Sequence, residues 1–424
     1  MEYLFYTLGT VGDALPFLKL AAALNAGGAR TVFLGNEKFA ALARSMDVEF
    51  RAVSSREDYE KTYNNPLTWS PAYNQNHYNQ FHLPAIRPTF KAIQEFVNDG
   101  HRPLVVFQDA LSGARMAAVE FDLPFVQIVL APSGIGSVVS PSYPTRKMVP
   151  EASWAQIIPK LVEKSEKDTY ERLVMPFINP VRQEVGLKAW KRHELPKLAQ
   201  SPHVLALFPT WLRERPADWP AQVENTGFVM SSLEVGFSQQ RFDEFVDAHG
   251  APITFSFGTG IPVTSHLIDK VARICKEVGR PGVLVAHTEC ERQVDDFDPP
   301  LLVMTVARFD HVFRRSCLVV HHGGIGTCAQ AFAAGVPQLV TPYSFDQPDN
   351  AFRLWQLGVG NSIDIMNASL TEIVAMVHSI TTDSDVAQKV AHYASLTFDA
   401  ADITAERLKI LAHQVREPQQ ATAV

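Results

Sequence analysis

The chain alternates short apolar runs with segments of helical length, and glycine or proline separates most of them. Short apolar runs bounded by turn residues are typical of buried parallel strands, and a helix between two such strands makes a βαβ unit. In the first half, strands are predicted at residues 3–8, 30–34, 104–108 and 125–130 and from residue 204, with a helix at residues 17–25. The pattern therefore predicts an α/β protein built on parallel sheets.

The second half repeats this pattern after a stretch that lacks it. Residues 213–239 show little periodicity and contain Pro216 and Pro220, which is typical of a linker. Strands are then predicted within PITFSFGTG (252–260) and at residues 282–286, 301–306, 318–320 and 336–341, with helices through Cys275 and over 370–413. We therefore predict a first domain at residues 1–212, a linker at 213–239, a second domain at 240–395 and a carboxyl-terminal segment at 396–424.

One stretch, LVVHHGGIGTCAQAFAAGVPQLVTPYSFDQPDNA (318–351), is the most informative part of the second domain. It predicts a buried strand, a turn rich in glycine, a helix that Gly335 ends, and a second strand followed by a polar loop at residues 343–350. Glycines let the backbone N–H groups at the start of a helix approach a ligand closely, and the helix dipole favours an anion there. An anion-binding site is therefore predicted at this turn.

Polar side chains follow both strands of this stretch. His322 and Thr327 come after the first strand, and Asp346 and Gln347 come after the second. Because ligands of open α/β sheets bind at the carboxyl ends of the strands, we expect these four side chains to share one site. The alternative is an ordinary strand–turn–helix whose glycines serve only the turn.

The turn after the first predicted strand, GTVGDALP, carries Asp13. It is not a GxGxxG dinucleotide fingerprint, and no acidic residue ends the second strand where a ribose would be held, so NAD is not the expected ligand. Asp13 lies beside the start of a helix, where capping is one explanation for an aspartate. A role in chemistry at the carboxyl edge of the sheet is the other.

The spacing from His322 through Gly335-Val336-Pro337 to Asp346-Gln347 resembles the donor-binding signature of the family 1 nucleotide-sugar glycosyltransferases. The resemblance covers nearly all 424 residues, including GTVGDALPFL, NPLTW, LFPTWL…DWP…TGF and AAGVPQ…DQPDNAFRL, and is closest to the bacterial rhamnosyltransferases of the rhamnolipid type. It implies the GT-B architecture, in which two Rossmann-like domains face each other across a cleft. A last helix would cross back to the first domain.

The resemblance implies a donor site in the second domain. The residues that would contact the diphosphate, the nucleoside or the sugar are Gly258, Thr259, Arg308, His322, Gly324, Gly326, Thr327, Gln330, Asp346 and Gln347. Arg308, beside Ala307, stands near the place where an aromatic ring commonly stacks on the base, and Gln330 stands where many UDP-sugar enzymes have a glutamate for the ribose. Because an amide accepts hydroxyl hydrogen bonds less strongly than a carboxylate, Gln330 favours a dTDP-sugar.

The resemblance also implies inverting transfer by a single displacement. Asp13 matches the aspartate of bacterial members with a G-x-x-G-D-x-x-P loop, so it would act as the general base for the acceptor hydroxyl. No DxD-type acidic pair stands where a metal would be needed. We expect no metal and no cofactor, with the nucleotide sugar as cosubstrate.

The segment between residues 56 and 98 lacks regular periodicity and is rich in aromatic side chains, and such segments within compact domains are often functional. Its aromatic residues would line an acceptor pocket or, equally well, form a satellite core under a surface loop. Asp109, after the strand at 104–108, would contact the acceptor or Asp13, or would cap a helix beginning at Ala110. The acceptor candidates are Asp109, Tyr63, Trp69, Tyr73, Tyr78 and Phe81.

Charge and composition narrow the class of protein. The net charge of −7 and the lack of a long basic run argue against nucleic acid as a partner. The four cysteines lack the spacing of a disulfide framework or a zinc site, and neither a signal peptide nor a membrane span is indicated, which predicts a cytoplasmic protein. Residues 154–187 combine apolar helical positions with several lysines, which fits a core-facing helix or peripheral contact with the inner membrane face.

Together these features predict a glycosyltransferase that moves a hexose or deoxyhexose from a dTDP- or UDP-sugar, with dTDP-rhamnose favoured. The acceptor would be a hydroxyl of a small lipophilic molecule, such as a hydroxy fatty acid lipid or a polyketide-type natural product. A nucleotide-sugar epimerase and a non-catalytic nucleotide-sugar sensor are the alternatives on the same fold.

Overall fold

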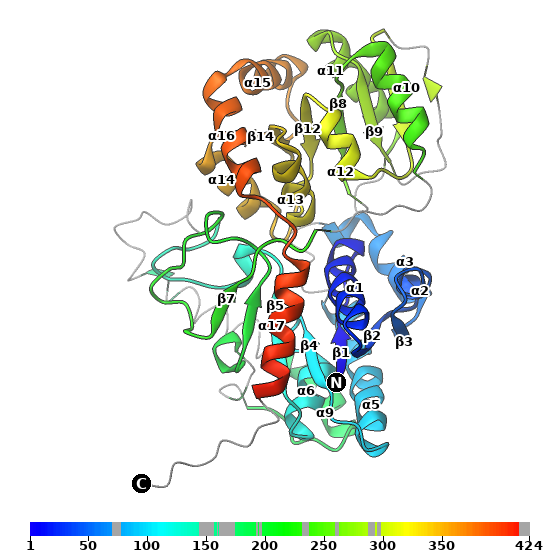
Figure 1. The fold of residues 1–424 in the computed structure, drawn as a ribbon, viewed down its shortest axis with the longest axis vertical. Coiled ribbons are helices and arrows are strands. Elements are labelled where there is room, and N and C mark those ends of the chain that lie inside the picture. The colour runs from blue at the N-terminus through cyan, green and yellow to red at the C-terminus, as the bar shows by residue number, and fades with distance from the viewer. Residues whose placement is uncertain are drawn as a thin grey trace.

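The computed structural model describes residues 1–69, 78–143, 157–158, 160, 174–191, 194, 197–230, 237–258, 263–286, 293–294 and 298–414. Within these residues, two sheets of seven strands each form, one in each half of the protein, and helices flank both sheets (Figure 1). The predicted α/β architecture of two parallel-sheet domains is confirmed. Thr259 and Tyr73 lie outside the described residues, as does the side chain of Trp69.

The first sheet is parallel throughout, with the strand order β3-β2-β1-β4-β5-β6-β7. Its strands are β1 (Glu2–Tyr6), β2 (Arg30–Asn36), β3 (Glu49–Ser54), β4 (Leu104–Phe107), β5 (Phe125–Val129), β6 (Val204–Ala206) and β7 (Val223–Asn225). The longer helices around it are α1 (Val11–Ala26), α2 (Ala40–Ser45), α3 (Arg56–Tyr63), α5 (Leu83–Asn98), α6 (Gly113–Glu120) and α9 (Met175–Glu184). Phe5 of β1 packs edge to face on Phe17 of α1, which fixes that helix on the sheet.

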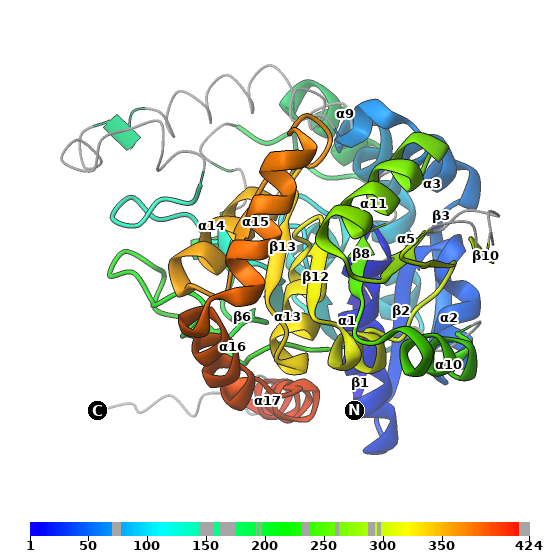
Figure 2. The same ribbon diagram turned by 90° about the horizontal axis from the view of Figure 1, so that it is seen from above.

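The second sheet has the order β10-β11-β9-β8-β12-β13-β14, and only β10 is antiparallel to its neighbour. Its strands are β8 (Ile253–Ser256), β9 (Gly282–Val285), β10 (Gln293–Val294), β11 (Leu301–Met304), β12 (Leu318–His321), β13 (Gln338–Val340) and β14 (Gly360–Ser362). Its helices are α10 (Gln239–His249), α11 (Ser265–Val278), α12 (Phe309–Val312), α13 (Ile325–Ala334), α14 (Gln347–Leu357), α15 (Leu370–Thr382) and α16 (Ser384–Leu396). The helices α11 and α15 lie side by side on one face of this sheet (Figure 2).

Both sheets reverse their strand order at one point, between β1 and β4 in the first sheet and between β8 and β12 in the second. At such a switch point the loops leave the sheet in opposite directions, so a crevice opens at the carboxyl ends of the strands. The loops after β1 and β4 and after β8 and β12 are therefore the places where each domain is built to hold a ligand.

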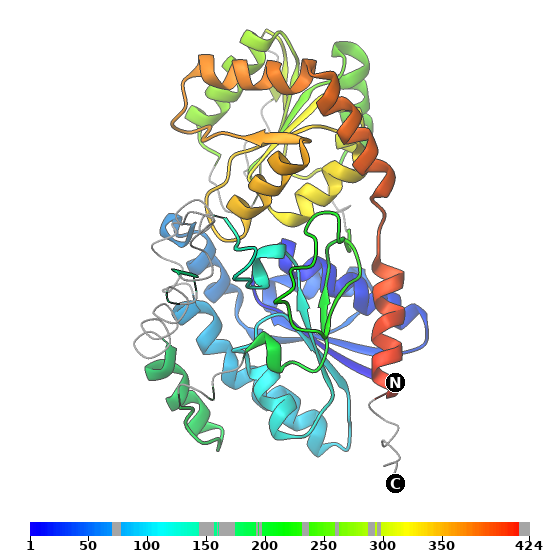
Figure 3. The ribbon, with the colours of Figure 1, turned by 90° about the vertical axis from the view of Figure 1, so that its left-hand side faces the viewer.

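The last helix, α17 (Ala401–Gln414), returns from the second domain and packs against α1 of the first (Figure 3). Ala405, Leu408 and Leu411 of α17 are buried in the first domain's core. The guanidinium of Arg407 binds the carboxylate of Glu224 in β7 through Nε, at 2.6 Å, and through a second nitrogen, at 2.5 Å. The helix thus belongs to the first domain although it comes last in the sequence.

The two domains also meet in an aromatic cluster. Trp211 of the first domain contacts Phe332 of α13, with ring centroids 4.9 Å apart, and Tyr393 of α16 at 5.0 Å. Nearby, the backbone N–H of Tyr143 donates to Asp349 of α14 at 2.9 Å, although that carboxylate is already paired with Arg353. The domain contact therefore combines one buried and two half-buried rings with a carboxylate that a backbone N–H and Arg353 both bind.

Several predicted boundaries need correction. The strand β7 lies inside the range predicted as linker, because three residues are too few to show a periodic pattern. The segment at 56–98 contains the helices α3 and α5, and the pattern of α5 was hidden by Pro84 in its first turn and Pro88 in its interior. The polar loop predicted at 343–350 ends where α14 begins, at Gln347.

None of the helices that the structure describes combines the length and the apolar character that a bilayer crossing requires. Of the segment at 154–187, for which membrane contact was one explanation, the structure describes residues 157–158, 160 and 174–187, and these include α9.

Candidate active site between the two sheet edges

Asp13 lies in the first turn of α1, at the carboxyl edge of the first sheet. Its Oδ2 accepts hydrogen bonds from the backbone N–H of Thr10, at 2.8 Å, and from the Thr10 hydroxyl, at 3.0 Å. Its Oδ1 accepts one from the side-chain amide of Gln108, at 3.1 Å. The capping contact that the sequence left open is thus made by one oxygen, while the other faces the loop after β4.

The loop after β12 holds His322, with β8 as its neighbour. An added Cβ at Gly324 would lie 2.6 Å from Nε2 of His322, and one at Gly258 would lie 2.9 Å from its Cε1. Only glycine therefore fits at these two positions, since real Cβ atoms do not approach so closely. The imidazole therefore lies against the glycines that follow β8 and β12, the two switch-point strands.

His322 is an uncharged imidazole at neutral pH. Burial lowers its pKa to about 4, an effect that the backbone of Ser256 only partly offsets. Its Nδ1 is buried and has no hydrogen-bond partner among the described residues. A neutral imidazole at the edge of a ligand site can still donate one hydrogen bond.

The preceding residue, His321, has a structural role. Its Nδ1 accepts the backbone N–H of Gly323 at 3.1 Å, and its Nε2 therefore donates to Gln338 at 3.0 Å. Burial also lowers the pKa of His321, to about 3, so this contact persists with a neutral ring. His321 thereby fixes the turn in which His322 and Gly324 lie.

The helix α13 begins directly after this turn, with Gly324 as its N-cap. A glycine cap has no side chain to occupy the first backbone N–H groups, and the first turn of α13 contains no acidic residue. Thr327 lies in the first turn, and Gln330 follows on the second, both buried. Gly326 has open space where its Cβ would be. This is the arrangement that favours an anion at a helix N-terminus.

Asp346 and Gln347 stand at the start of α14, on the neighbouring edge. Burial, together with the charge of Asp13, raises the pKa of Asp346 to about 6, although a hydrogen bond from Asn350 opposes the rise. Asp13 of the first domain is thus among the charges that act on Asp346. Gln347 turns its side-chain oxygen to the backbone N–H groups of Tyr343 and Ser344, at 2.8 and 3.1 Å, which leaves its NH₂ as the group for a ligand.

Asn350 links the turn before α13 to the start of α14. Its Nδ2 donates to Asp346 at 2.7 Å and to the carbonyl of Gly323 at 2.9 Å. The turn that precedes α13 and the carboxylate that precedes α14 are therefore held at a fixed spacing. Phe345, directly before Asp346, adopts a left-handed φ of 57°, a conformation that costs about 1 kcal/mol or more in a residue other than glycine.

Arg308 is the N-cap residue of α12, at the end of the loop after β11. Its guanidinium donates to Asp310, at 2.6 Å from one nitrogen and 3.3 Å from Nε. The adjacent ring of Phe309 stacks on Phe313, with the centroids 4.6 Å apart. The guanidinium plane is thus held by Asp310, and Phe309 is directed toward its own helix.

The acceptor candidates separate into two groups. Tyr63 and Phe81 are buried in the first domain's core, where their rings contact each other at 5.2 Å. Tyr78 lies nearer the edge, where its hydroxyl donates to the carbonyl of Leu111 at 3.2 Å and its ring stacks on His82. Burial, and to a lesser extent the charge of Asp13, raise the pKa of the Tyr63 hydroxyl.

Asp109 caps a turn of its own. Its Oδ1 accepts the backbone N–H of Leu111 at 2.8 Å, and its Oδ2 lies 3.5 Å from the ring of His82. The helix α6 begins at Gly113 with Ser112 as its cap, so the prediction of a helix beginning at Ala110 is wrong. The contact with Asp13 expected of Asp109 is made instead by the preceding residue, Gln108.

Sequence reasoning missed Gln108 and Asn350. Gln108 is the last residue of the strand predicted at 104–108, at the sheet edge where ligand residues were sought, and this position was the available signal. Asn350 lies four residues after Asp346, the spacing at which two side chains on one helical turn meet.

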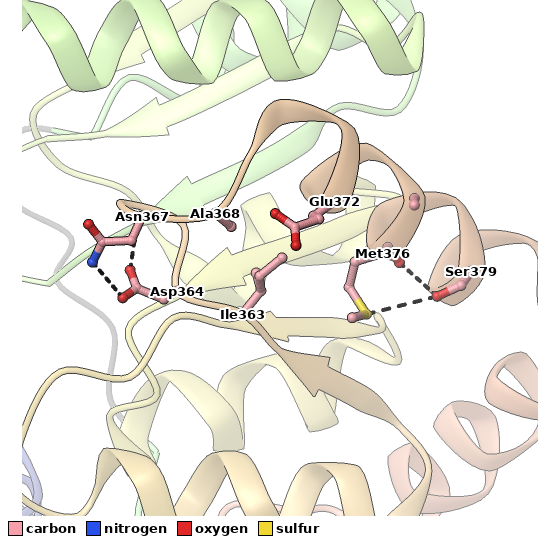
Figure 4. Close-up of a pocket in the computed structure, with 8 residues that line it drawn as sticks. Ile363, Asp364, Asn367, Ala368, Glu372, Met376 and Ser379 are labelled. Carbon is pink, nitrogen blue, oxygen red and sulfur yellow. Dashed lines mark hydrogen bonds between the residues drawn. The ribbon is translucent and has the colours of Figure 1, made fainter.

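An open pocket of about 620 Å³ lies apart from these residues, between the end of β14 and α15 (Figure 4). Its carboxylates are engaged in their own turns, since Asp364 accepts the N–H groups of Met366 and Asn367, and Glu372 accepts that of Ser369. These groups do not converge on a ligand, so the pocket is not part of the candidate site.

The sequence matches one known family model and a named relative. Residues 265–400 match the family model described as "Erythromycin biosynthesis protein CIII-like, C-terminal domain". Over 410 residues, 91% of each chain, the protein is 24% identical to O-mycaminosyltylonolide 6-deoxyallosyltransferase of Streptomyces fradiae.

Solved structures show the same fold. The calicheamicin glycosyltransferase CalG4 superimposes with a TM-score of 0.72 at 18% identity, covering 98% of this chain and 99% of that one. The glycosyltransferase VinC in complex with dTDP superimposes with a TM-score of 0.67 at 14% identity, covering 98% of this chain and 100% of that one.

Proposed function

We propose that this glycosyltransferase, a family 1 enzyme of the GT-B fold, transfers a deoxyhexose with inversion from a dTDP-sugar to a hydroxyl of a small lipophilic natural product. A UDP-sugar donor is the second choice, and dTDP-rhamnose is the favoured donor because the sequence resembles the rhamnolipid-type rhamnosyltransferases. The observation that carries the proposal is that Asp13 lies at the carboxyl edge of the first sheet, while the glycine-capped N-terminus of α13 lies at the carboxyl edge of the second.

The carboxyl edge of the second sheet, where His322, α13 and Asp346 lie, is called the donor edge. It suits a nucleoside diphosphate. The N-terminus of α13, with a glycine cap and no acidic residue in its first turn, would meet the diphosphate, and His322 would donate a hydrogen bond as a neutral imidazole. Thr259, outside the described residues, is proposed to assist as well. These groups would stabilise the charge that develops as the diphosphate leaves, and the proposal needs no cofactor and no metal.

Two observations support dTDP over UDP. Gln330 offers an amide where a carboxylate would accept ribose hydroxyl groups more strongly, and a deoxyribose has one hydroxyl fewer to bind. The structural neighbour VinC was solved with dTDP bound. Arg308, held by Asp310, would present its guanidinium plane to the base.

The proposed acceptor lies on the first domain's side of the site. The relative from Streptomyces fradiae is named for 6-deoxyallosyl transfer to O-mycaminosyltylonolide, which supports a natural-product acceptor. Tyr78, at the edge beside Asp109, is the described aromatic residue that fits an acceptor contact. If the acceptor is a lipid, peripheral contact with the inner membrane face would supply it.

In the proposed mechanism, the free lone pair of Asp13 accepts the proton of the acceptor hydroxyl while that oxygen attacks the anomeric carbon. The bond to the diphosphate oxygen breaks in the same step, and the nucleoside diphosphate leaves. Asp346 and the NH₂ of Gln347 would hold the sugar hydroxyls, which orients the anomeric carbon for in-line attack.

Release of the nucleoside diphosphate, measured with panels of dTDP- and UDP-sugars with and without acceptors, tests this function. Acceptor-dependent release supports transfer, epimerised sugar nucleotide without release supports an epimerase, and binding with neither supports a sensor. In Asp13→Ala, transfer should be lost while dTDP still raises the melting temperature. Unchanged turnover in that variant would exclude Asp13 as the base.

His322→Ala tests the donor edge separately. Loss of one hydrogen bond to a developing anion should lower kcat/KM by roughly 10-fold to 1,000-fold. Turnover equal to the wild type would refute the role of this imidazole at the diphosphate.

A further inference from the structure

A series of polar groups leads from the interior of the first domain to Asp13. Ser201 donates to the side-chain oxygen of Gln127 at 2.6 Å, and the NH₂ of Gln127 donates to the backbone carbonyl of Gln108 at 3.2 Å. The side chain of Gln108 then bridges the Thr7 hydroxyl, at 2.6 Å, and Oδ1 of Asp13, at 3.1 Å. Ser201, Gln127 and Thr7 are buried, whereas Gln108 and Asp13 are half-buried, so water competes least at the inner end of the series.

The two ends of the Gln108 amide are fixed by their partners. An ionised Asp13 has no proton, so only the NH₂ end of the amide can face it favourably. The oxygen end then accepts from the Thr7 hydroxyl. The register of the sheet brings these groups together, because Tyr6 pairs with Phe107 and Thr7 and Gln108 are the next residues along the two strands. The switch point of the first sheet thus places an oriented amide beside the base.

The hydrogen bonds of Asp13 leave it one direction open. A carboxylate can accept about four hydrogen bonds, and Thr10 supplies two to Oδ2 while Gln108 supplies one to Oδ1. The Asp13 carboxylate fits in this orientation only because residue 9 is a glycine. Gly9 has a φ of +145°, and an added Cβ there would lie 2.4 Å from Oδ2 of Asp13. The lone pair that remains on Oδ1 therefore has a defined direction.

The neutrality of the amide matters because a second carboxylate faces Asp13 from the other domain. Asp13 already acts on Asp346 across the site. A carboxylate directly after β4 would add a third negative charge, whereas the amide of Gln108 donates a hydrogen bond without charge. From this geometry we infer that Gln108 is the positioning residue of the proposed base, and that Thr7 selects the amide orientation that makes it one. The inference rests on the proposed role of Asp13.

The expected kinetics follow from the contacts. Gln108→Leu removes the donor and should lower kcat by about 10-fold to 100-fold at all pH values, because a hydrogen bond to a charged group is lost, with KM for the donor unchanged. Thr7→Val removes only the orienting hydroxyl and should lower kcat a few-fold. The double variant should equal Gln108→Leu alone, because without the amide the hydroxyl has nothing left to orient.

Gln108→Glu separates positioning from a merely structural role. Two adjacent carboxylates share one proton at low pH, so the acid limb of the kcat profile should move up by about one pH unit or more. Above that limb turnover should level off near that of Gln108→Leu, because an ionised glutamate cannot donate to Asp13. Gln240→Glu is the matched control. There an exposed amide donates to Glu244 at 2.9 Å on α10, in the other domain from Asp13, and the pH profile should not move.

Three results would overturn the inference: an unshifted acid limb in Gln108→Glu, additive losses in the double variant, or a donor KM that rises with the loss of kcat in Gln108→Leu. Failure of the proposed function would look different, because Asp13→Ala would then retain turnover or the wild type would release no nucleoside diphosphate. In that event, a double-mutant cycle of Thr7→Val and Gln108→Leu still tests the contact between these two side chains. The quantity measured is the free energy of unfolding in urea. Additive shifts there would reject the oriented amide.

Discussion

Replacement of Asp346 by asparagine should stabilise the fold while it impairs donor binding. The pKa of Asp346 rises from 3.8 to about 6 in the folded protein, chiefly through burial and also through the charge of Asp13. A carboxyl group whose pKa is raised on folding favours the folded state only at low pH. That contribution is fully present below pH 3.8 and is lost as the pH rises through 6, so at neutral pH the ionised group opposes folding.

The magnitude follows from the difference between the two pKa values. A shift of roughly two pH units corresponds to about 3 kcal/mol, and partial exposure of the side chain reduces this to roughly 1–3 kcal/mol. Asparagine keeps an oxygen that can accept the hydrogen bond from Asn350, observed at 2.7 Å, so this contact survives the substitution. The variant should therefore gain about 1–3 kcal/mol in free energy of unfolding at pH 8, and about half of that at pH 5.

Urea unfolding of the wild type and Asp346→Asn at pH 8 and pH 5 measures this gain. Asp269→Asn, an exposed carboxylate on α11, is the control and should change the free energy of unfolding by less than about 0.5 kcal/mol. A variant that is no more stable than the wild type at pH 8 would show that the carboxylate is not under strain in the folded protein.

The same substitution should affect donor and nucleotide differently. A carboxylate that accepts sugar hydroxyl groups contributes more than an amide, so affinity for the nucleotide sugar should fall roughly 10-fold to 100-fold. Affinity for dTDP alone should stay within about twofold, because Asp346 is proposed to contact only the sugar. Equal losses for both ligands, measured by calorimetry, would assign Asp346 to the diphosphate instead.

Three further predictions use other parts of the structure. Gly326→Ala adds a methyl group in open space at the N-terminus of α13, so the melting temperature should stay unchanged or rise. The methyl group should nevertheless weaken dTDP binding roughly 10-fold, measured by calorimetry. The control Gly136→Ala, also in open space, should leave the melting temperature and dTDP binding unchanged. Gln330→Glu should raise the kcat/KM ratio of UDP-sugar to dTDP-sugar roughly 10-fold, and an unchanged ratio would remove this residue from ribose recognition. Leu408→Ala should cost about 2–5 kcal/mol in urea unfolding, whereas Ile410→Ala, which is 42% exposed on the same helix, should cost less than about 0.5 kcal/mol.

The second domain's edge was the most predictable part of the molecule. Its strand, glycine turn and helix follow one another within residues 318–335, so short-range rules of periodicity and turn chemistry suffice. The structure has β12, the turn and α13 in that order, with α13 ending before Gly335 as predicted. The roles assigned to His322, Asp346 and Gln347 remain predictions that the proposed variants test.

The contacts of Asp13 could not be predicted in the same way. Gln108 lies 95 residues away in the sequence and reaches Asp13 only because β1 and β4 are neighbours in the sheet. The sequence suggested Asp109 as the residue in contact with Asp13, because carboxylates take part in catalysis more often than amides do. The parallel register of β1 and β4 and the alternation of side chains along a strand point Gln108, and not Asp109, toward Asp13. Both depend on the order of the strands in the sheet rather than on composition.

The position of α17 has a consequence for how the protein is made. The core beneath α1 is completed by Leu408 and Leu411, so the first half of the protein to leave the ribosome lacks part of its own interior until the last residues of α17 are synthesised. During translation an apolar side of α1 stays uncovered while the entire second domain emerges. Nascent polypeptides that stall before residue 401 should therefore be recognised by chaperones or degraded, and catalysis begins only with full-length molecules.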